Sequence, residues 1–561
     1  MHFFLIKPPK ILLILSMLLM LASSCNDEGL TFIKDPVVVK NKNNSAPLTA
    51  FVDFETSNSV DSIFIKISDG ERFTHLAYDT NDKYKSGYLI KYMAPDRNQI
   101  IKLGIKDQSG VYHDLKDSLI FNTAPLPKDD LLFPKIEISK NELSSGEVLT
   151  LINPRRRIPV VVPGSNKFNA LYGLLVIVNQ KGEVLWYYQT DSRISDFDIL
   201  PNGNISFITQ DNRIREIDFS GEIINEWYAS QRPENTQNTG NEIPVDTPTF
   251  HHDTALLNNG NRLVLSTEIR EIDNYYTSER NRNAPRKKQN VVGDVVIEFN
   301  PEGKIVHQWK AFDHMPVMRI GYETFSNYWI RRGFPDAIDW SHANAIVPVD
   351  NDESYLVNFR YQSAILKVHK KSGKIDWIFA EKSGWGEALQ DKLLKIPANG
   401  LNWHQHSPRF TKSGGILFFN NNNYQSRPFE KTKSIIDSPS YVVEYKIDEE
   451  SREVQKIWST ENDGMEKVYS IAMGRVSELE NSGNILACYG ALLDPKYFDE
   501  MDWWNRIKYP QWTMVREYTK TTKPIIVWEM RLHPLTENSK VSWTLFGAER
   551  IGSSKLPSNH H

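Results

Sequence analysis

Short apolar segments separated by glycine and asparagine turns run along most of the chain, and one arrangement of them repeats. In residues 197–227 a strand-like segment leads into the turn Pro201-Asn202-Gly203-Asn204, and two further segments follow, the last ending in Trp227. The same arrangement, again ending in tryptophan, occupies residues 256–309, 345–377, 410–458 and 476–528, with an earlier partial copy in 174–186. Short strands recurring at a period of roughly 40 to 70 residues predict a β-propeller with one blade per copy. The chain is therefore predicted to be all-β, with a six-bladed β-propeller.

The residues before the repeats predict a separate, smaller domain. Strand-like segments at 51–54, 62–67, 88–92 and 100–105, separated by turn residues, are typical of a small β-sandwich. We expect an N-terminal β-sandwich over residues 26–127 and the propeller over residues 128–555. Two long insertions, 271–292 and 312–340, interrupt the repeats, and we expect them to rise over one face of the propeller, where binding sites commonly lie.

The first 25 residues predict export rather than a folded element. Lys7 and Lys10 precede an apolar run, Ile11–Leu21, that is too short to span a bilayer as a helix. Ala22-Ser23-Ser24-Cys25 then resembles a bacterial lipoprotein cleavage site, with Cys25 as the lipidated first residue of the mature chain. A plain secretory signal is the alternative. We expect residues 1–25 to be a lipoprotein-type signal peptide and the mature protein to be anchored by lipid to the bacterial outer membrane, facing either the periplasm or the surface.

Composition excludes some partners and leaves others open. A net charge of −4 gives no electrostatic case for nucleic acid as a partner, which would call for a basic face. The chain has two cysteines, Cys25 and Cys488, so a lipidated Cys25 leaves no internal disulfide. Membrane contact is expected through the lipid anchor alone, and a homodimer is one of the assemblies open to the protein.

The repeats bring several histidines into one equivalent position. Counting back eight residues from the turn glycines Gly203, Gly260, Gly414 and Gly483, and from Asp350 in the remaining copy, gives Ser195, His252, His406, Arg475 and His342. The innermost strands of a propeller surround its axis, so equivalent positions are expected to converge on the mouth of one channel. A single histidine is most often a core or capping residue, but three at one repeat position with an arginine indicate a functional ring.

The residue types in this ring favour an anion over a metal. Three histidines could hold a metal with an open coordination site, but no carboxylate or cysteine joins them at a ligand-like position and an arginine would repel a cation. Imidazole and guanidinium donors suit a group with several oxygens. The chain has no glycine-rich phosphate loop or dinucleotide fingerprint, so the anion is predicted to be part of a substrate, and no cofactor is expected.

Four stretches resemble the bacterial arylsulfate sulfotransferases: FHHDTALLNNGN (250–261), DWSHANAI (339–346), FRYQSAI (359–365) and QH (405–406). The resemblance implies a β-sandwich followed by a six-bladed propeller, and transfer of a sulfuryl group from a phenolic sulfate to a phenol without a nucleotide donor. It implies that His406 is the nucleophile, forming a sulfohistidine, and that His252, His342 and Arg360 bind the sulfuryl oxygens. Asn344 falls in a matching His-x-Asn motif and is expected to bind substrate; Arg475 is assigned the same role from the repeat count alone.

Two other functions remain open from the sequence. A propeller-fold polysaccharide lyase could use axial histidine, tyrosine and arginine side chains to neutralise a uronate and abstract its proton. A non-catalytic lipoprotein could use the same ring to bind anionic ligands or glycans. A transferase predicts a reaction accelerated by added phenol, a lyase predicts an unsaturated sugar product, and a binding protein predicts neither.

Overall fold

The computed structural model describes residues 30–552, apart from 144–146, 160, 233–239, 462–463, 465 and 538. The predicted leader and Cys25 lie outside the described residues. The regular secondary structure of the described residues is nearly all strand, with several short 3-10 helices and two short α-helices, α1 (Ser165–Ala170) and α2 (Ala311–His314). In this part of the chain no helix is long and apolar enough to cross a membrane. The predicted all-β class is confirmed.

The N-terminal strands form two sheets that share one core. One sheet has the order β1-β2-β5 and the other β4-β3-β6-β7, with β8 pairing β6. Their bounds are β1 (Phe32–Lys40), β2 (Ala50–Thr56), β3 (Val60–Ser68), β4 (Phe73–Asp79), β5 (Tyr88–Ile90), β6 (Asn98–Asp107), β7 (Tyr112–Asp114) and β8 (Leu119–Asn122). Buried and exposed residues alternate through the first half of β6, as expected where one face of a sheet packs on the core and the other meets solvent.

Six further sheets follow, each of four or five main strands. From the innermost strand outwards, the first sheet contains β35 (Ser542–Ile551), β10 (Leu149–Arg157), β11 (Gly173–Asn179) and β12 (Val184–Thr190), and the second contains β13 (Ile194–Ile199), β14 (Ile205–Thr209), β15 (Arg213–Ile217), β16 (Ile223–Ala229) and β17 (Ile243–Val245). The third contains β18 (His251–Leu256), β19 (Arg262–Tyr275), β20 (Lys287–Phe299) and β21 (Ile305–Lys310), with β22 (Ala337–Asp339) beside β20, and the fourth contains β23 (Ala343–Val349), β24 (Ser354–Phe359), β25 (Ala364–His369) and β26 (Ile375–Phe379). The fifth contains β27 (His406–Phe410), β28 (Ile416–Asn420), β29 (Tyr441–Ile447) and β30 (Val454–Ser459), and the sixth contains β31 (Arg475–Glu478), β32 (Ile485–Leu493), β33 (Gln511–Tyr518), β34 (Ile526–His533) and β9 (Lys135–Asn141).

The innermost strands form a closed ring. β13 packs beside β18, β18 beside β23, β23 beside β27, β27 beside β31, β31 beside β35, and β35 beside β13. Central strands such as β11, β24 and β32 are buried along their whole length because neighbouring sheets cover both of their faces. Sheets arranged around a common axis in this way are those of a β-propeller, which confirms the predicted fold class.

The tryptophan that ends each repeat joins one sheet to the next. Its indole N–H donates to a turn of the following sheet: Trp186 to the Phe219 carbonyl (2.8 Å), Trp227 to Pro301 (2.8 Å), Trp309 to Gly373 (3.0 Å), Trp377 to the Glu449 carboxylate (3.0 Å) and Trp528 to Gln180 (2.9 Å). The last of these bonds runs from the sixth sheet back to the first. Trp458 is different, since its indole nitrogen has no hydrogen-bond partner among the described residues.

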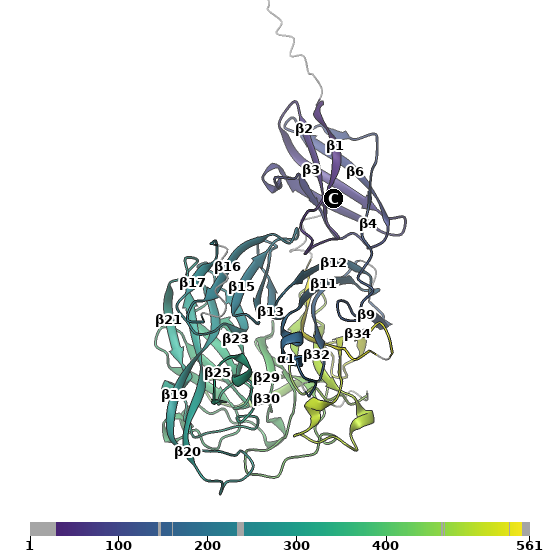
Figure 1. The fold of residues 1–561 in the computed structure, drawn as a ribbon. Coiled ribbons are helices and arrows are strands. Elements are labelled where there is room, and N and C mark those ends of the chain that lie inside the picture. The colour runs from purple at the N-terminus through teal and green to yellow at the C-terminus, as the bar shows by residue number, and fades with distance from the viewer. Residues whose placement is uncertain are drawn as a thin grey trace, which may run out of the picture.

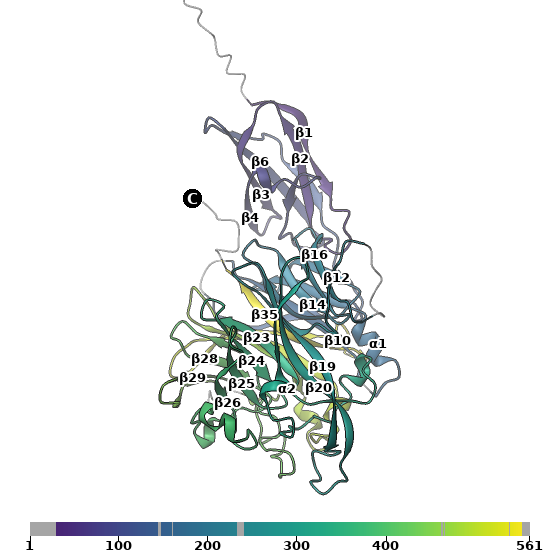
Figure 2. The same ribbon diagram turned by 90° about the vertical axis from the view of Figure 1, so that its left-hand side faces the viewer.

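Both ends of the propeller chain are tied into sheets distant in sequence. β35 pairs with β10, aligning Ile551 with Leu149, and so completes the first sheet from the opposite end of the chain. β9 pairs with β34 at the outer edge of the sixth sheet. Figures 1 and 2 show the N-terminal sandwich at one end of the propeller, beyond β12 and β16, and the β19–β20 hairpin extending towards the opposite end. The sandwich and the first two propeller sheets share one hydrophobic core.

Candidate active site

The predicted ring positions lie at the beginning of the innermost strands, where the backbone departs from regular pairing. β18, β23 and β27 each have a register shift within their first residues. His252 and His342 have left-handed backbone angles, with φ of 58° and 51°, and Ser407 beside His406 has φ of 53°. Bulges redirect side chains, and strained backbone concentrates at functional sites. Three successive sheets therefore turn a histidine away from the regular strand at the same level.

The structure brings these histidines together with two tyrosines. The ring centroids of His252 and His342 are 4.8 Å apart. Tyr361 stacks on His342 at 4.3 Å, and Tyr328 meets His342 edge-on at 4.6 Å. His404 extends the group, with its ring 6.0 Å from that of Tyr361. The predicted convergence of histidines is present, and aromatic rings enclose it.

The hydrogen bonds of His406 fix which of its nitrogens carries the proton. Nδ1 lies 2.6 Å from the side-chain oxygen of Asn421, whose amide group donates to the Met473 carbonyl at 3.0 Å. Nδ1 is therefore the protonated nitrogen, and Nε2 accepts a hydrogen bond from the Met473 N–H at 3.1 Å. Burial, together with Arg360, lowers the His406 pKa to about 3. At neutral pH this histidine is neutral, with its lone pair on Nε2.

A chain of hydrogen bonds gives His252 the same tautomer. His251 Nε2 lies 3.0 Å from the Ser266 carbonyl, so it must donate, and its Nδ1 must accept from Nδ1 of His252 at 2.8 Å. The lone pair of His252 is then on Nε2, which lies 3.3 Å from the hydroxyl of Tyr328. Burial and the nearby His342 hold the pKa of His252 well below its usual value. His252 therefore presents a proton acceptor to a phenol.

His342 presents the opposite character. Its Nδ1 lies 2.6 Å from Asp339, whose other oxygen accepts the Trp329 indole N–H at 3.1 Å. Burial raises the Asp339 pKa to about 8 and, with Arg360, lowers the pKa of His342. The pair is expected to be neutral overall, with one proton shared between Nδ1 and the carboxylate. In either position of that proton, Nε2 carries a hydrogen and acts as a donor.

Arg360 reaches this group from the end of β24 and is held by a carboxylate. It donates to Glu323 and, at 2.8 Å, to the Ile471 carbonyl. Glu323 belongs to the 312–340 insertion, has φ of 72°, and also contacts Arg506 and the hydroxyl of Tyr424 (3.1 Å). The buried Nε of Arg360 has no hydrogen-bond partner among the described residues. Two arginines thus converge on one anionic group beside the histidines.

Asn344 and Arg475 are placed differently from the histidines. Asn344 donates to the Gln405 carbonyl at 3.1 Å and shares a buried amide network with Asn358, so it supports the segment that carries His406. Arg475 donates to Asp196 at 2.7 Å and Asp198 at 2.8 Å, and it also pairs with Glu549 at 3.1 Å. These carboxylates neutralise the Arg475 guanidinium and accept its hydrogen bonds. Arg475, the predicted ring residue of the sixth sheet, therefore does not supply a free donor.

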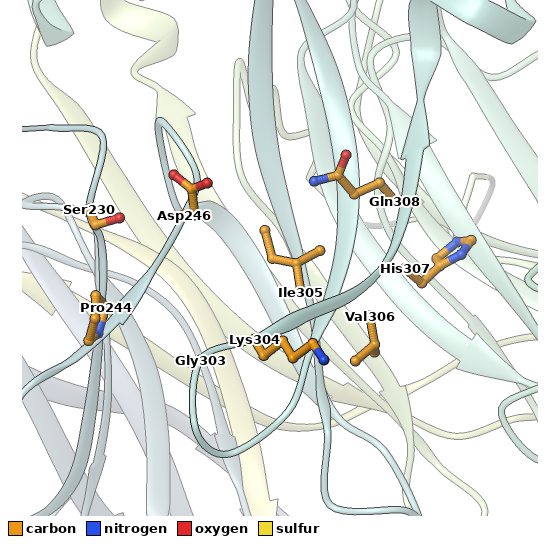
Figure 3. A pocket seen from close by; sticks show the side chains of 9 residues that line it. All are labelled: Ser230, Pro244, Asp246, Gly303, Lys304, Ile305, Val306, His307 and Gln308. Carbon is orange, nitrogen blue, oxygen red and sulfur yellow. The ribbon is translucent and has the colours of Figure 1, made fainter.

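One small cavity lies at the ring positions and a larger one lies away from them. Asn344, His406 and Arg475 line a cavity of about 10 Å³ on the propeller axis, space for roughly one water. A larger cavity of about 620 Å³ lies at the outer rim between β17 and β21, and Figure 3 shows its His307 directed away from Ser230 and Asp246. In the described chain no group of three or more His, Cys, Asp or Glu side chains is arranged to hold a metal ion.

Comparison with known proteins identifies the family of the chain. The sequence profile of the family described as Arylsulfotransferase (ASST) matches residues 135–533. This chain belongs to the arylsulfotransferase family. The resemblance drawn from the four motifs is confirmed.

Individual relatives of this arylsulfotransferase-family chain match over a shorter region. The arylsulfate sulfotransferases AssT of Escherichia coli O6:H1 and of Lelliottia amnigena are each 29% identical over 138 residues. The match spans 21% of this chain and 22% of each relative. Among solved structures, a Pseudomonas aeruginosa periplasmic gluconolactonase is 9% identical with a TM-score of 0.31, over 72% of this chain and 99% of its own.

Three residues that contact the predicted histidines were not singled out from the sequence: Asn421, Tyr328 and Asp339. Asn421 lies in a run of four asparagines that begins with the last residue of β28, and the sequence gave no reason to prefer one of them. Tyr328 lies in the 312–340 insertion, which belongs to no repeat. Asp339 was within a quoted motif, and its position three residues before His342 was the one available signal. The catalytic and binding roles assigned to His252, His342, His406, Arg360, Asn344 and Arg475 stay predictions.

Proposed function

We propose that this protein is an aryl-sulfate sulfotransferase that moves a sulfuryl group from a phenolic sulfate ester to a phenol, through a sulfohistidine at His406 and without a nucleotide cofactor. Family membership over residues 135–533 supports the activity. The observation that carries the mechanism is the tautomer of His406, since its hydrogen bond to Asn421 leaves an unprotonated Nε2. A neutral imidazole nitrogen is a competent nucleophile, and a covalent intermediate divides one difficult transfer into two easier ones.

In the first half-reaction, Nε2 of His406 attacks the sulfur of the donor. An N–S bond forms, the S–O bond to the donor breaks, and the donor leaves as a phenolate. In the structure, the Met473 N–H donates to the lone pair on Nε2. When Nε2 attacks, this hydrogen bond is lost as the N–S bond forms, and the Met473 N–H can donate to a sulfuryl oxygen instead. Arg360 and Nε2–H of His342 supply further donors, and losing one such donor typically costs on the order of a hundredfold in rate.

In the second half-reaction, the oxygen of the acceptor phenol attacks the same sulfur and the N–S bond breaks. The phenol must lose its proton, and His252 Nε2 is the acceptor, since it already receives a hydrogen bond from the phenolic hydroxyl of Tyr328. His406 returns to its neutral form. Tyr361 and Tyr328 cover His342 and His406 itself is 5% exposed, and exclusion of water protects the intermediate from hydrolysis.

The test follows para-nitrophenol release from para-nitrophenyl sulfate by the mature protein, with and without a phenol acceptor. We expect release to be strongly accelerated by the acceptor and abolished in His406→Ala. His369→Ala is the matched control, because His369 lies at the end of β25 and its Nδ1 contacts only the nearby Ser372. Mass spectrometry of the quenched enzyme without acceptor should find the sulfuryl group on the His406 peptide. Acceptor-independent release would indicate a sulfatase, and no release from any phenolic sulfate would refute the proposal.

We also propose that the protein is exported and anchored to the outer membrane by lipid on Cys25. The motif that ends at Cys25 and the short apolar run before it support this proposal. Labelled fatty acid should be incorporated by the wild type and lost in Cys25→Ala. Incorporation that persists in Cys25→Ala would contradict it.

A further inference from the structure

Three partly exposed arginines lie near the partly exposed members of the histidine group. His342, His404 and His406 are buried, whereas His252 and Tyr328 are partly exposed. Arg155 from β10, Arg193 before β13 and Arg332 from the 312–340 insertion are also partly exposed. They come from three different segments of the chain.

Direct contacts place these guanidinium groups beside the candidate site. Arg332 lies over the ring of Tyr328 at 3.5 Å, and Tyr328 stacks on His252 with ring centroids 5.7 Å apart. Arg155 lies over Phe546 at 4.5 Å and donates to the sulfur of Met473 at 3.3 Å. Met473 is the residue whose N–H reaches His406.

The same groups lie close to one another although they carry the same charge. Arg193 and Arg332 both donate to the side-chain oxygen of Gln210, Arg332 at 3.1 Å. Burial and Arg332 lower the Arg193 pKa to about 9, and burial and Arg193 lower that of Arg155. Adjacent cations in a partly buried position are unfavourable unless an anion accompanies them.

No carboxylate among the described residues forms an ion pair with any of these three arginines. The hydrogen bonds of Arg155, Arg193 and Arg332 go to backbone carbonyls, a thioether and an amide oxygen. The two nearby carboxylates are engaged elsewhere, Asp196 with Arg475 at 2.7 Å and Asp339 with His342 at 2.6 Å. This contrasts with Arg475 itself, which three carboxylates neutralise.

We propose that Arg155, Arg193 and Arg332 form a subsite for a second oxyanion on the acceptor, so that the preferred acceptors are phenols carrying a carboxylate or sulfate group. This inference rests on the proposed sulfuryl transfer. The planar donor forks of arginine match such oxyanions, and hydrogen bonds between charged groups are stronger than neutral ones. The subsite holds the second anion while the phenolic oxygen faces His252.

The test compares para-hydroxyphenylacetate with para-hydroxyphenylacetamide as acceptors, with para-nitrophenyl sulfate as donor. The two phenols differ in the charge of one side group. We expect kcat/KM to be at least about tenfold higher for the acid. Arg193→Gln and Arg332→Gln should each reduce this acid-to-amide ratio by about tenfold, and Arg193→Lys should keep part of it because the charge remains.

Arg156→Gln is the matched control. Arg156 is the neighbour of Arg155 in β10, but its guanidinium lies over Phe168 at 4.0 Å, so the ratio should stay at the wild-type value. Equal kcat/KM for acid and amide in the wild type, or an unchanged ratio in both glutamine variants, would overturn the subsite.

A second measurement separates the subsite from the proposed activity. If the wild type transfers no sulfuryl group, calorimetric titration with each phenol still reports binding. Tighter binding of the acid that is lost in Arg193→Gln would support the subsite while the transferase proposal fails. Equal binding of acid and amide would overturn the subsite as well.

Discussion

Asn421 is predicted to set the reactivity of His406 without touching the substrate. Its side-chain oxygen accepts the Nδ1–H of His406 at 2.6 Å, and its amide group donates to the carbonyls of Ser470 and Met473. Asn421→Ala removes the acceptor and leaves a buried N–H without a partner. That penalty of about 1–3 kcal/mol reduces the preference for the tautomer with its lone pair on Nε2, which the Met473 N–H still favours, and corresponds to at most a roughly 5- to 150-fold loss in the rate of the first half-reaction.

The assay is single-turnover release of para-nitrophenol from para-nitrophenyl sulfate, which isolates formation of the sulfo-enzyme. Asn421→Asp keeps an acceptor oxygen and adds a negative charge, so it should retain activity and shift the acid limb of the pH profile upwards, because a nearby anion raises the His406 pKa. A purely structural role for Asn421 would not move that limb.

A control separates loss of the hydrogen bond from loss of stability. Asn402→Ala removes another buried asparagine, whose amide donates to the Ser363 carbonyl at 3.3 Å and does not contact His406. Its first-turnover rate should stay near that of the wild type. If folded Asn421→Ala also reacts within about twofold of the wild type, the reasoning about the tautomer is refuted.

Three further predictions follow from the same structure. Because the His406 pKa is lowered to about 3, its ring stays neutral as pH falls, so the first half-reaction should be flat from pH 7, below the Asp339 pKa of about 8, to about 5; a midpoint near the ordinary value of 6.5 would contradict this. His252→Asn should slow the second half-reaction most for weakly acidic phenols and least for nitrophenols, and equal slowing across a phenol series would exclude a general base. Trp528→Phe removes the bond to Gln180 that closes the ring, and should lower the free energy of unfolding by about 1 kcal/mol more than Trp458→Phe, whose indole nitrogen has no partner among the described residues. Urea denaturation compares the two variants, and equal losses would contradict that account.

The repeat predicted the fold because its residues have a direct structural role. The terminal tryptophans of five copies bond to the next sheet. The completion of the first sheet by β35 was not predicted, because pairing between Ile551 and Leu149 depends on closure of the whole ring rather than on any local pattern.

The histidine positions were predictable for the same reason, since equivalent residues of a cyclic repeat must meet at its axis. The repeat pattern predicts where the Cα atom of such a residue lies. It does not predict where the side chain points or which groups it contacts. Arg475 occupies an equivalent position, yet Asp196 and Asp198 of another sheet neutralise it. Nothing in the local sequence around Arg475 shows which carboxylates will face it.

The sequence by itself determined the all-β class, the propeller repeat and the level at which His252, His342 and His406 gather. The tertiary structure alone decided the proton positions of His406 and His252. That of His406 depends on Asn421, whose amide is oriented by carbonyls of Ser470 and Met473, just before the sixth sheet. That of His252 depends on His251 and the Ser266 carbonyl. The physical reason is the separation along the chain over which each kind of interaction acts. Hydrophobic periodicity and turn residues act over a few neighbours and are written in the sequence, whereas hydrogen bonds between loops of different sheets exist only after the ring has closed.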